Sequence, residues 1–305
     1  KIHTMKNQYL FLILIIMLLG CTNESKEFSK LTGQAINNNL NEKYLGPIID
    51  MHAHIYPSSS SENFDYIDNL VLEAKKAGVS KICLGLHARH LNNRPPTYSY
   101  QHDKWIMRSY KKYPDIIIPF LGSFNPDDET SLVYVENELK KNIWKGIGEL
   151  DLRNSIKQTK TPMNSTIMMR VFLLASKYDV PVLIHNEFCY GTKCELGKNE
   201  MRNALKENPQ TIFIIAHECP IDLMSEFSNL MYELNPFSIV PNEFVDRIII
   251  GTDVQSPDLI IESGSEIYLP RYYEGIDLIR QILFQTHDAE KIAYSNAAKI
   301  LNLKG

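Results

Sequence analysis

Six residues that can bind a metal or carry a proton each end a short apolar run of the chain. They are His52, His54, Glu149, His185, His217 and Asp253. Each run is typical of a buried parallel strand, because such strands are continuous stretches of apolar residues. A polar residue at the carboxyl end of such a strand lies where α/β folds place their chemistry. Five runs ending in this way predict one shared site, and the residue types predict that it binds metal.

The spacing within these runs supports that prediction. His52 and His54 are separated by one residue, so both imidazoles lie on the same face of a strand. In a closed barrel that face points inward, and the other strand ends reach the same mouth. Imidazoles and a carboxylate suit a divalent ion with open positions for water; zinc fits best, while manganese, iron and nickel stay open. Glu149 can place its carboxylate between two metal positions.

The elements that must position these residues follow an alternating pattern. Short apolar runs alternate with longer amphipathic ones, which predicts repeated β/α units around a parallel sheet. Strands are expected near residues 48–53, 80–86, 116–122, 146–151, 181–185, 211–216, 230–234 and 247–252. The seventh is the least distinct because it is short and contains a charge. Eight strands in about 260 residues predict an α/β fold, a single (β/α)8 TIM barrel with a C-terminal helical extension.

The first residues predict export. An apolar run from Tyr9 to Leu19 follows Lys6 and ends in Leu-Leu-Gly-Cys21. A membrane-spanning helix needs roughly 20 apolar residues, so this shorter run favours a secretory signal peptide. Leu-Leu-Gly-Cys resembles the lipobox of bacterial lipoproteins, which implies cleavage before Cys21 and lipidation of its thiol. An uncleaved apolar anchor with a chance cysteine is the alternative.

This interpretation divides the chain into three parts. Residues 1–21 form the lipoprotein signal peptide, 22–45 a polar flexible tether, and 46–305 the barrel. The body is then expected outside the cytoplasm, anchored to the bacterial membrane by lipid alone. The formal net charge is −4, and removing residues 1–20 deletes two lysines and makes it −6. A mildly acidic body does not favour nucleic acid, so the expected partner is a small-molecule substrate.

The remaining cysteines carry weaker predictions. Cys189 and Cys194 could close a disulfide in an oxidising compartment. Cys83 lies in an apolar strand and is expected to be buried and inert. Cys219 follows His217 closely enough to approach the metal, although the oxygen and nitrogen ligands already suffice.

The ligand pattern resembles a known superfamily. Asp50-Met-His-Ala-His54, later strand-end histidines and a Gly-Thr-Asp resemble the amidohydrolase superfamily, specifically its amidohydrolase-related branch of metal-dependent TIM-barrel hydrolases. The tail from Asn296 to Leu301, Asn-Ala-Ala-Lys-Ile-Leu, is similar to that branch's closing signature, although Ser295 replaces the usual glycine. The resemblance covers about residues 47 to 303.

The resemblance implies roles for individual residues. His52, His54 and Asp253 would bind a first metal, and His185 and His217 a second. Glu149 would bridge them, where many relatives use a carboxylated lysine. Glutamate at this place resembles TatD-like and phosphotriesterase-homology members. Many amidohydrolase-related enzymes, including decarboxylases, use one metal and no bridging acid.

Hydrolysis is the reaction that this site predicts. A bound divalent ion makes hydroxide available near neutral pH, and Asp253 can accept and return a proton as the catalytic residue. The bond would be an ester, lactone, amide or phosphoester of a small molecule. His87 and Arg89 are substrate-binding candidates because they follow the second strand, although a solvated basic loop explains them equally well. The alternatives are a mononuclear decarboxylase of the same fold and a non-catalytic metal-binding surface lipoprotein.

Overall fold

The computed structural model describes most of the chain beyond its first residues. The described ranges are 42–55, 65–86, 98–155, 157–188, 195–218, 220–236, 240–241, 243–254 and 272–303. Residues 1–41, with Cys21 and most of the expected tether, therefore lie outside the described part, and the predicted signal peptide and domain boundaries stay predictions. Within the described ranges, every helix is too short or too polar to cross a membrane.

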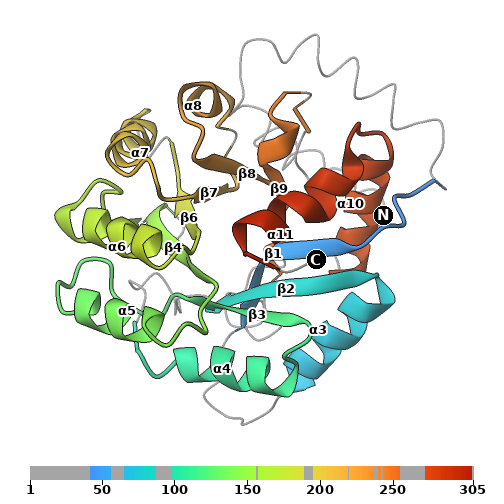
Figure 1. Cartoon of the computed structure of the whole chain (residues 1–305), viewed down its shortest axis with the longest axis horizontal. Coiled ribbons are helices and arrows are strands. Elements are labelled where there is room, and N and C mark those ends of the chain that lie inside the picture. The colour runs from blue at the N-terminus through green and yellow to red at the C-terminus, as the bar shows by residue number, and fades with distance from the viewer. Residues whose placement is uncertain are drawn as a thin grey trace, which may run out of the picture.

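The strands form one closed sheet (Figure 1). Their bounds are Ile48–Ile55 for β1, Val79–Leu86 for β2, Ile117–Leu121 for β3, Gly146–Asn154 for β4, Thr159–Lys160 for β5, Val182–Asn186 for β6, Phe213–Ala216 for β7, Leu230–Leu234 for β8 and Ile248–Ile250 for β9. All neighbours in the ring pair in parallel, and the pairing of β3 with β4 and of β1 with β9 closes it. Only the short β5 adds an antiparallel edge, on β4. All eight predicted strands are confirmed, and β5 is the one addition within the described ranges.

Helices surround this ring (Figure 1). Their bounds are Asp65–Lys76 for α3, Asp103–Lys112 for α4, Ser131–Leu139 for α5, Thr166–Lys177 for α6, Leu196–Glu207 for α7, Ile221–Glu226 for α8, Tyr272–Phe284 for α10 and Asn296–Ile300 for α11, with short turns of 3-10 and π type at Val245–Arg247 and Lys291–Ser295. The order of strands and helices is that of a (β/α)8 barrel.

The core has two layers. One cluster joins the outer faces of the strands to the helices, with residues such as Leu70, Ile106 and Val135. The other fills the barrel interior and includes Met51 and the buried, free Cys83, as the sequence predicted. Apolar burial of this extent is the main stabilising contribution to such a fold.

The C-terminal extension closes the end of the barrel that lies opposite the carboxyl ends of the strands. Ala297 and Leu301 of α11 belong to the interior cluster. The amide of Asn296 donates hydrogen bonds to the carbonyls of Val245 and Ile248, at the start of β9. The closing sequence therefore plugs the barrel, which leaves the carboxyl ends of the strands as the open face.

Candidate metal centre

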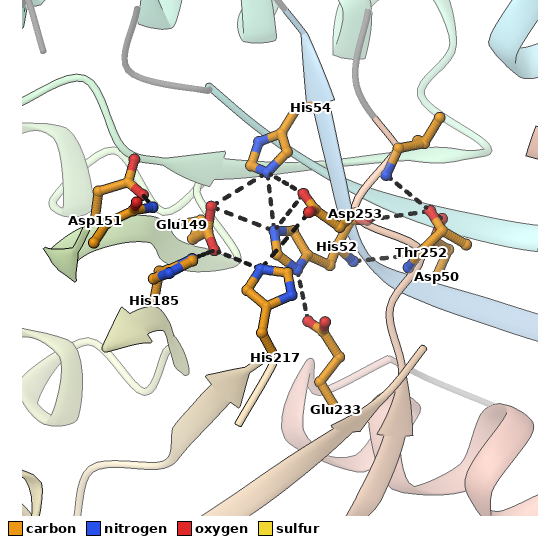
Figure 2. A network of polar contacts seen from close by, with 12 residues as sticks. Asp50, His52, His54, Glu149, Asp151, His185, His217, Glu233, Thr252 and Asp253 are labelled. Atoms are coloured by element: carbon orange, nitrogen blue, oxygen red, sulfur yellow. Dashed lines mark hydrogen bonds and ion pairs between the residues drawn. The ribbon is translucent and has the colours of Figure 1, made fainter. Parts of the chain in front are cut away.

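The structure brings all six predicted ligands together at the carboxyl ends of the strands (Figure 2). They come from β1, β4, β6 and the turns that follow β7 and β9, namely His52, His54, Glu149, His185, His217 and Asp253. We call His52 and His54 the β1 pair, and His185 and His217 the β6–β7 pair.

A bulge in β1 aims the β1 pair inward. Met51 lies inside the barrel, so simple alternation along the strand would turn His52 outward. The register with β2 instead slips by one residue between Asp50 and Ala53. Such a β-bulge shifts every later side chain to the other face. Both histidines consequently point into the barrel, and Ala53 points toward the helices.

A second bulge, in β4, orients the side chain of Glu149. The register between β4 and β6 shifts between Ile147 and Leu150, both of which pack against the helix layer. The extra residue leaves Glu149 pointing inward, where only 5% of its surface is exposed. Bulges beside active sites commonly redirect a side chain in this way.

The first ligand set surrounds the β1 pair. The Nε2 atoms of His52 and His54 lie 2.9 Å apart. Asp253 Oδ1 lies 3.1 Å from His54 Nε2 and 3.5 Å from His52 Nε2. Glu149 Oε2 lies 3.4 Å from His54 Nε2 and 3.6 Å from His52 Nε2. Four side chains thus direct one atom each to a common point.

The second ligand set surrounds the β6–β7 pair. The other oxygen of Glu149, Oε1, lies 3.4 Å from His185 Nδ1 and 3.4 Å from His217 Nε2. His217 Nε2 also lies 3.6 Å from Asp253 Oδ2. Glu149 therefore belongs to both sets and gives one oxygen to each.

Two ligands adopt left-handed backbone conformations. His217 has φ of 67° and Asp253 has φ of 50°. His217 directly follows β7 and Asp253 is the third residue after β9, so the turn that leaves the sheet also directs each side chain back over the mouth. Residues other than glycine adopt this conformation at a cost, and strained backbone of this kind is found at functional sites as well as in ordinary turns.

The donor atoms fit a divalent ion. Among the described residues, the buried oxygens Glu149 Oε1 and Asp253 Oδ1 accept no hydrogen bond. Buried polar atoms normally have partners, and leaving them without one costs free energy. Imidazole nitrogens and carboxylate oxygens facing one another at about 3 Å are the ligand types that zinc and related ions bind.

The titration of these groups reflects their crowding. Burial would raise the pKa of Glu149, but His52, His185 and His217 hold it well below its usual value. Burial would lower the pKa of His185, but Glu149 and Glu187 raise it to about 10. The pKa of His52 is likewise raised, against burial, by neighbouring carboxylates. In the metal-free protein His52 and His185 therefore hold protons that an ion would displace.

Asp50 organises the β1 side of the centre, a role that sequence reasoning did not assign. This buried carboxylate accepts hydrogen bonds from the backbone NH of His52 and of Thr252, at 3.1 and 3.0 Å. It also accepts from the hydroxyls of Thr252 and Tyr272, at 2.7 and 2.9 Å. The first and last strands are thereby fixed to each other immediately beside His52 and Asp253.

Glu233 is a further residue that sequence reasoning missed. It lies on β8, fully buried, with Oε2 2.7 Å from His52 Nδ1 (Figure 2). Its charge made β8 the least distinct strand in the sequence, whereas a charge within an apolar run was itself the signal of a functional position.

Asp151 follows Glu149 on the same face of β4. Lys157 Nζ lies 2.7 Å from each of its carboxylate oxygens, and Asn154 donates a further hydrogen bond. These contacts satisfy the charge of Asp151 within the protein and set it apart from the two ligand sets.

Several predicted residues lie outside the described ranges. They are the substrate-binding candidates His87 and Arg89 and the cysteines Cys189, Cys194 and Cys219. Their roles stay predictions.

Solved structures with the same fold are enzymes of related types. An amidohydrolase II structure matches with a TM-score of 0.59 and 14% identity, over 84% of this chain and 99% of that one. A 2,6-dihydroxybenzoate decarboxylase from Rhizobium matches with a TM-score of 0.58 and 13% identity, over 87% and 99%. A 4-oxalomesaconate hydratase from Rhodopseudomonas palustris matches with a TM-score of 0.56 and 12% identity, over 84% and 95%. These likenesses show the fold.

Sequence comparison identifies the family. A search of curated protein sequences gave no match. The family model described as TatD-related DNase matches residues 49–299, nearly the whole barrel. This range holds every residue of the two ligand sets and most of the closing α11. The chain therefore belongs to the TatD-related DNase family.

Proposed function

We propose that this protein is a hydrolase that uses two divalent ions. The observation that carries the proposal is the position of Glu149, whose two oxygens face two different ligand sets. A single-ion enzyme has no need of a carboxylate shared in this way. Zinc is the ion that the donor types favour, with manganese, iron and nickel as alternatives.

The reaction that this arrangement supports is hydrolysis. When bound, divalent ions lower the pKa of a coordinated water toward about 7 and polarise a carbonyl or phosphoryl oxygen. Asp253 lies between the two sets, with Oδ1 toward His54 and Oδ2 toward His217. Its carboxylate can accept the proton of the attacking water and return it to the leaving group.

Exposure indicates the side from which a substrate enters. The side chains of His52 and His54 are 0% and 1% exposed, whereas those of His185, His217 and Asp253 are 17%, 27% and 26% exposed. The substrate would therefore approach over the β6–β7 pair, and the β1 pair would form the floor.

The substrate that we propose is a small molecule with an ester, lactone, amide or phosphoester bond. The family description names a DNase, whereas the net charge of −4 gives no general attraction to a polyanion. Single-stranded and duplex DNA therefore belong in the substrate panel beside the small molecules. Cleavage of DNA at a rate above that of every small molecule would correct the substrate class and leave the hydrolytic centre intact.

The deciding experiment compares Glu149→Gln with the unchanged protein. Both are reconstituted with zinc or manganese, and metal content and turnover are measured together. We expect about two ions per wild-type chain, and one ion with activity reduced on the order of a hundredfold or more in the variant. Glu138→Gln, in which a partly buried carboxylate of α5 bound to Lys141 and Trp144 is altered, is the isosteric control and should match wild type in metal content and turnover.

Two outcomes would favour other functions. A Glu149→Gln variant that keeps one ion and full activity would favour a mononuclear decarboxylase, which is tested by assaying aromatic and α,β-unsaturated acids. Tight metal binding without turnover on any substrate would favour a non-catalytic metal-binding surface lipoprotein.

We also propose that the barrel works outside the cytoplasm, tethered by lipid at Cys21. The support is the sequence Leu-Leu-Gly-Cys21 after an apolar run. Expressed in a bacterium, the wild-type chain should incorporate labelled fatty acid and sediment with membranes. Cys21→Ser should do neither, and labelling of that variant would contradict the proposal.

A further inference from the structure

A buried carboxylate lies behind His52 and takes no part in either ligand set. Glu233 is 0% exposed, and its Oε2 lies 2.7 Å from His52 Nδ1. Its other oxygen, Oε1, has no hydrogen-bond partner among the described residues. Burying a carboxylate is costly, and a structural one normally has both oxygens satisfied. A single contact, made to a metal ligand, therefore points to a role in the metal centre.

The chemistry of the contact defines that role. A carboxylate only accepts hydrogen bonds, so the proton of this contact belongs to His52 Nδ1. Once an ion has displaced the other proton of His52, the lone pair of the imidazole is on Nε2, the atom that faces His54, Glu149 and Asp253. We propose that Glu233 is a positioning residue that fixes the tautomer and orientation of His52, a role that rests on the proposed metal centre.

The neighbouring strand shows that space is reserved for Glu233. A Cβ atom added to Gly251, on the chain directly after β9, would lie 2.5 Å from Glu233 Cδ and 2.6 Å from both Cγ and Oε2. Real side chains do not approach so closely, and a fully buried carboxylate has little freedom to move away. The Glu233 side chain thus occupies the space that a side chain at position 251 would fill, and its position depends on glycine being there.

This pairing makes a prediction that separates positioning from general stability. Adding a methyl group at 251 should displace Glu233 and, through it, His52. Removing the carboxylate should create the room that the methyl group needs. Gly251→Ala should therefore be harmful in the wild type and nearly neutral in a Glu233→Ala background, which is the non-additivity expected of residues that act through one contact.

The experiment measures zinc affinity by competition with a chelator in four proteins: wild type, Glu233→Ala, Gly251→Ala and the double variant. Loss of a carboxylate behind a metal-bound histidine lowers affinity by about 10- to 100-fold. We expect such a loss in both single variants and no further loss in the double variant. Glu233→Gln, whose amide oxygen can still accept from Nδ1, should recover part of the affinity.

A matched control and a spectroscopic readout exclude a merely structural effect. A Cβ at Gly275 would meet only Pro236, at an ordinary 3.5 Å, so Gly275→Ala should leave zinc affinity unchanged. In ¹⁵N spectra of the zinc-loaded protein, His52 should be protonated at Nδ1 and bound through Nε2, and the Nδ1 proton should shift in Glu233→Gln.

The outcomes are distinct. Wild-type affinity in Glu233→Ala, or additive losses in the double variant, would overturn the role of Glu233 and leave the proposed hydrolase standing. The expected affinity pattern without turnover on any substrate would retain the role of Glu233 and overturn hydrolysis. A wild-type chain that binds no zinc or manganese would overturn both.

Discussion

The two histidine pairs of the centre are built differently, although they share Glu149. The β1 pair is buried, and its surroundings are tied by hydrogen bonds: Glu233 contacts His52, and Asp50 links the strand to Thr252. The β6–β7 pair is partly exposed, and the nearest further carboxylate to His185 is Glu187, 3.9 Å from Nε2. Rigid support and desolvation favour tight binding, whereas exposure leaves room for water and substrate. We expect the β1 pair to hold its ion tightly and the β6–β7 pair to exchange it.

The largest expected effect separates the pairs by deleting one ligand from each. His54→Asn should bind less than one ion per chain and lose activity by at least about a thousandfold. His217→Asn should keep one ion, and asparagine suits the left-handed backbone there, so the fold is retained. Metal analysis after dialysis and turnover assays measure both. One retained ion in His54→Asn and none in His217→Asn would reverse the comparison.

The second prediction concerns pH. The pKa of His185 is raised to about 10 by Glu149 and Glu187 despite burial, so in the metal-free protein this imidazole keeps its proton up to that pH. An incoming ion must displace the proton, and each displaced proton makes affinity rise about tenfold per pH unit. Zinc affinity should accordingly increase from pH 6.5 to 8.5, measured by chelator competition. His185→Asn should show a shallower slope; an unchanged slope would show that this proton is not displaced.

The third prediction tests the support beneath the β1 pair. Asp50→Asn should lower the free energy of unfolding of the metal-free protein by about 1–3 kcal/mol, because one acceptor atom becomes a donor facing two hydroxyls. Burial raises the pKa of Asp50 to about 6, above its unfolded value. Its stabilising contribution is therefore present at low pH and lost as the pH rises through about 6. The stability gap between wild type and variant should narrow from pH 4 to 7 in urea titrations.

Asp103→Asn is the matched control for that variant. Asp103 lies on α4, outside the centre, and burial likewise raises its pKa to about 6. It should show a similar narrowing without weakening zinc binding, whereas Asp50→Asn should weaken zinc binding as well. Equal zinc affinity in both variants would mean that Asp50 supports the fold and not the β1 pair.

The smallest effect is expected from Tyr272→Phe. The hydroxyl donates to Asp50 at 2.9 Å and the ring is buried. Removing the hydroxyl should cost about 0.5–1.5 kcal/mol of stability. Zinc affinity should stay unchanged because three other donors still hold Asp50. Urea titration and chelator competition measure the two quantities, and a stability loss above that range would give Tyr272 a larger role than one hydrogen bond.

Much of the barrel could be predicted because its strands are buried on both faces. Runs such as Ile248–Ile250 carry no competing pattern, and the polar residues that follow them mark the open end. The prediction for the β1 pair was right, but alternation alone gave an incomplete reason. Whether His52 points inward depends on a bulge, which arises from pairing with β2 and leaves no local mark in the sequence.

The supporting residues could not be predicted because they depend on neighbours distant in sequence. Asp50 meets Thr252 only when the barrel closes and β1 lies beside β9. Glu233 meets His52 for the same reason, across 181 positions. In the sequence alone, the single charge of Glu233 within a five-residue run has two equal interpretations. It indicates either that the run is a doubtful strand or that the charge is a buried residue with a role in the site.

The left-handed conformations of His217 and Asp253 lower the stability of the fold while they position the side chains of the site. Each costs about 1 kcal/mol that a glycine would not incur. Selection for stability alone would therefore favour glycine at both positions and would yield a sturdier barrel without a metal centre. A screen of variants for stability alone would therefore enrich His217→Gly and Asp253→Gly, which lack donor atoms of the candidate metal centre.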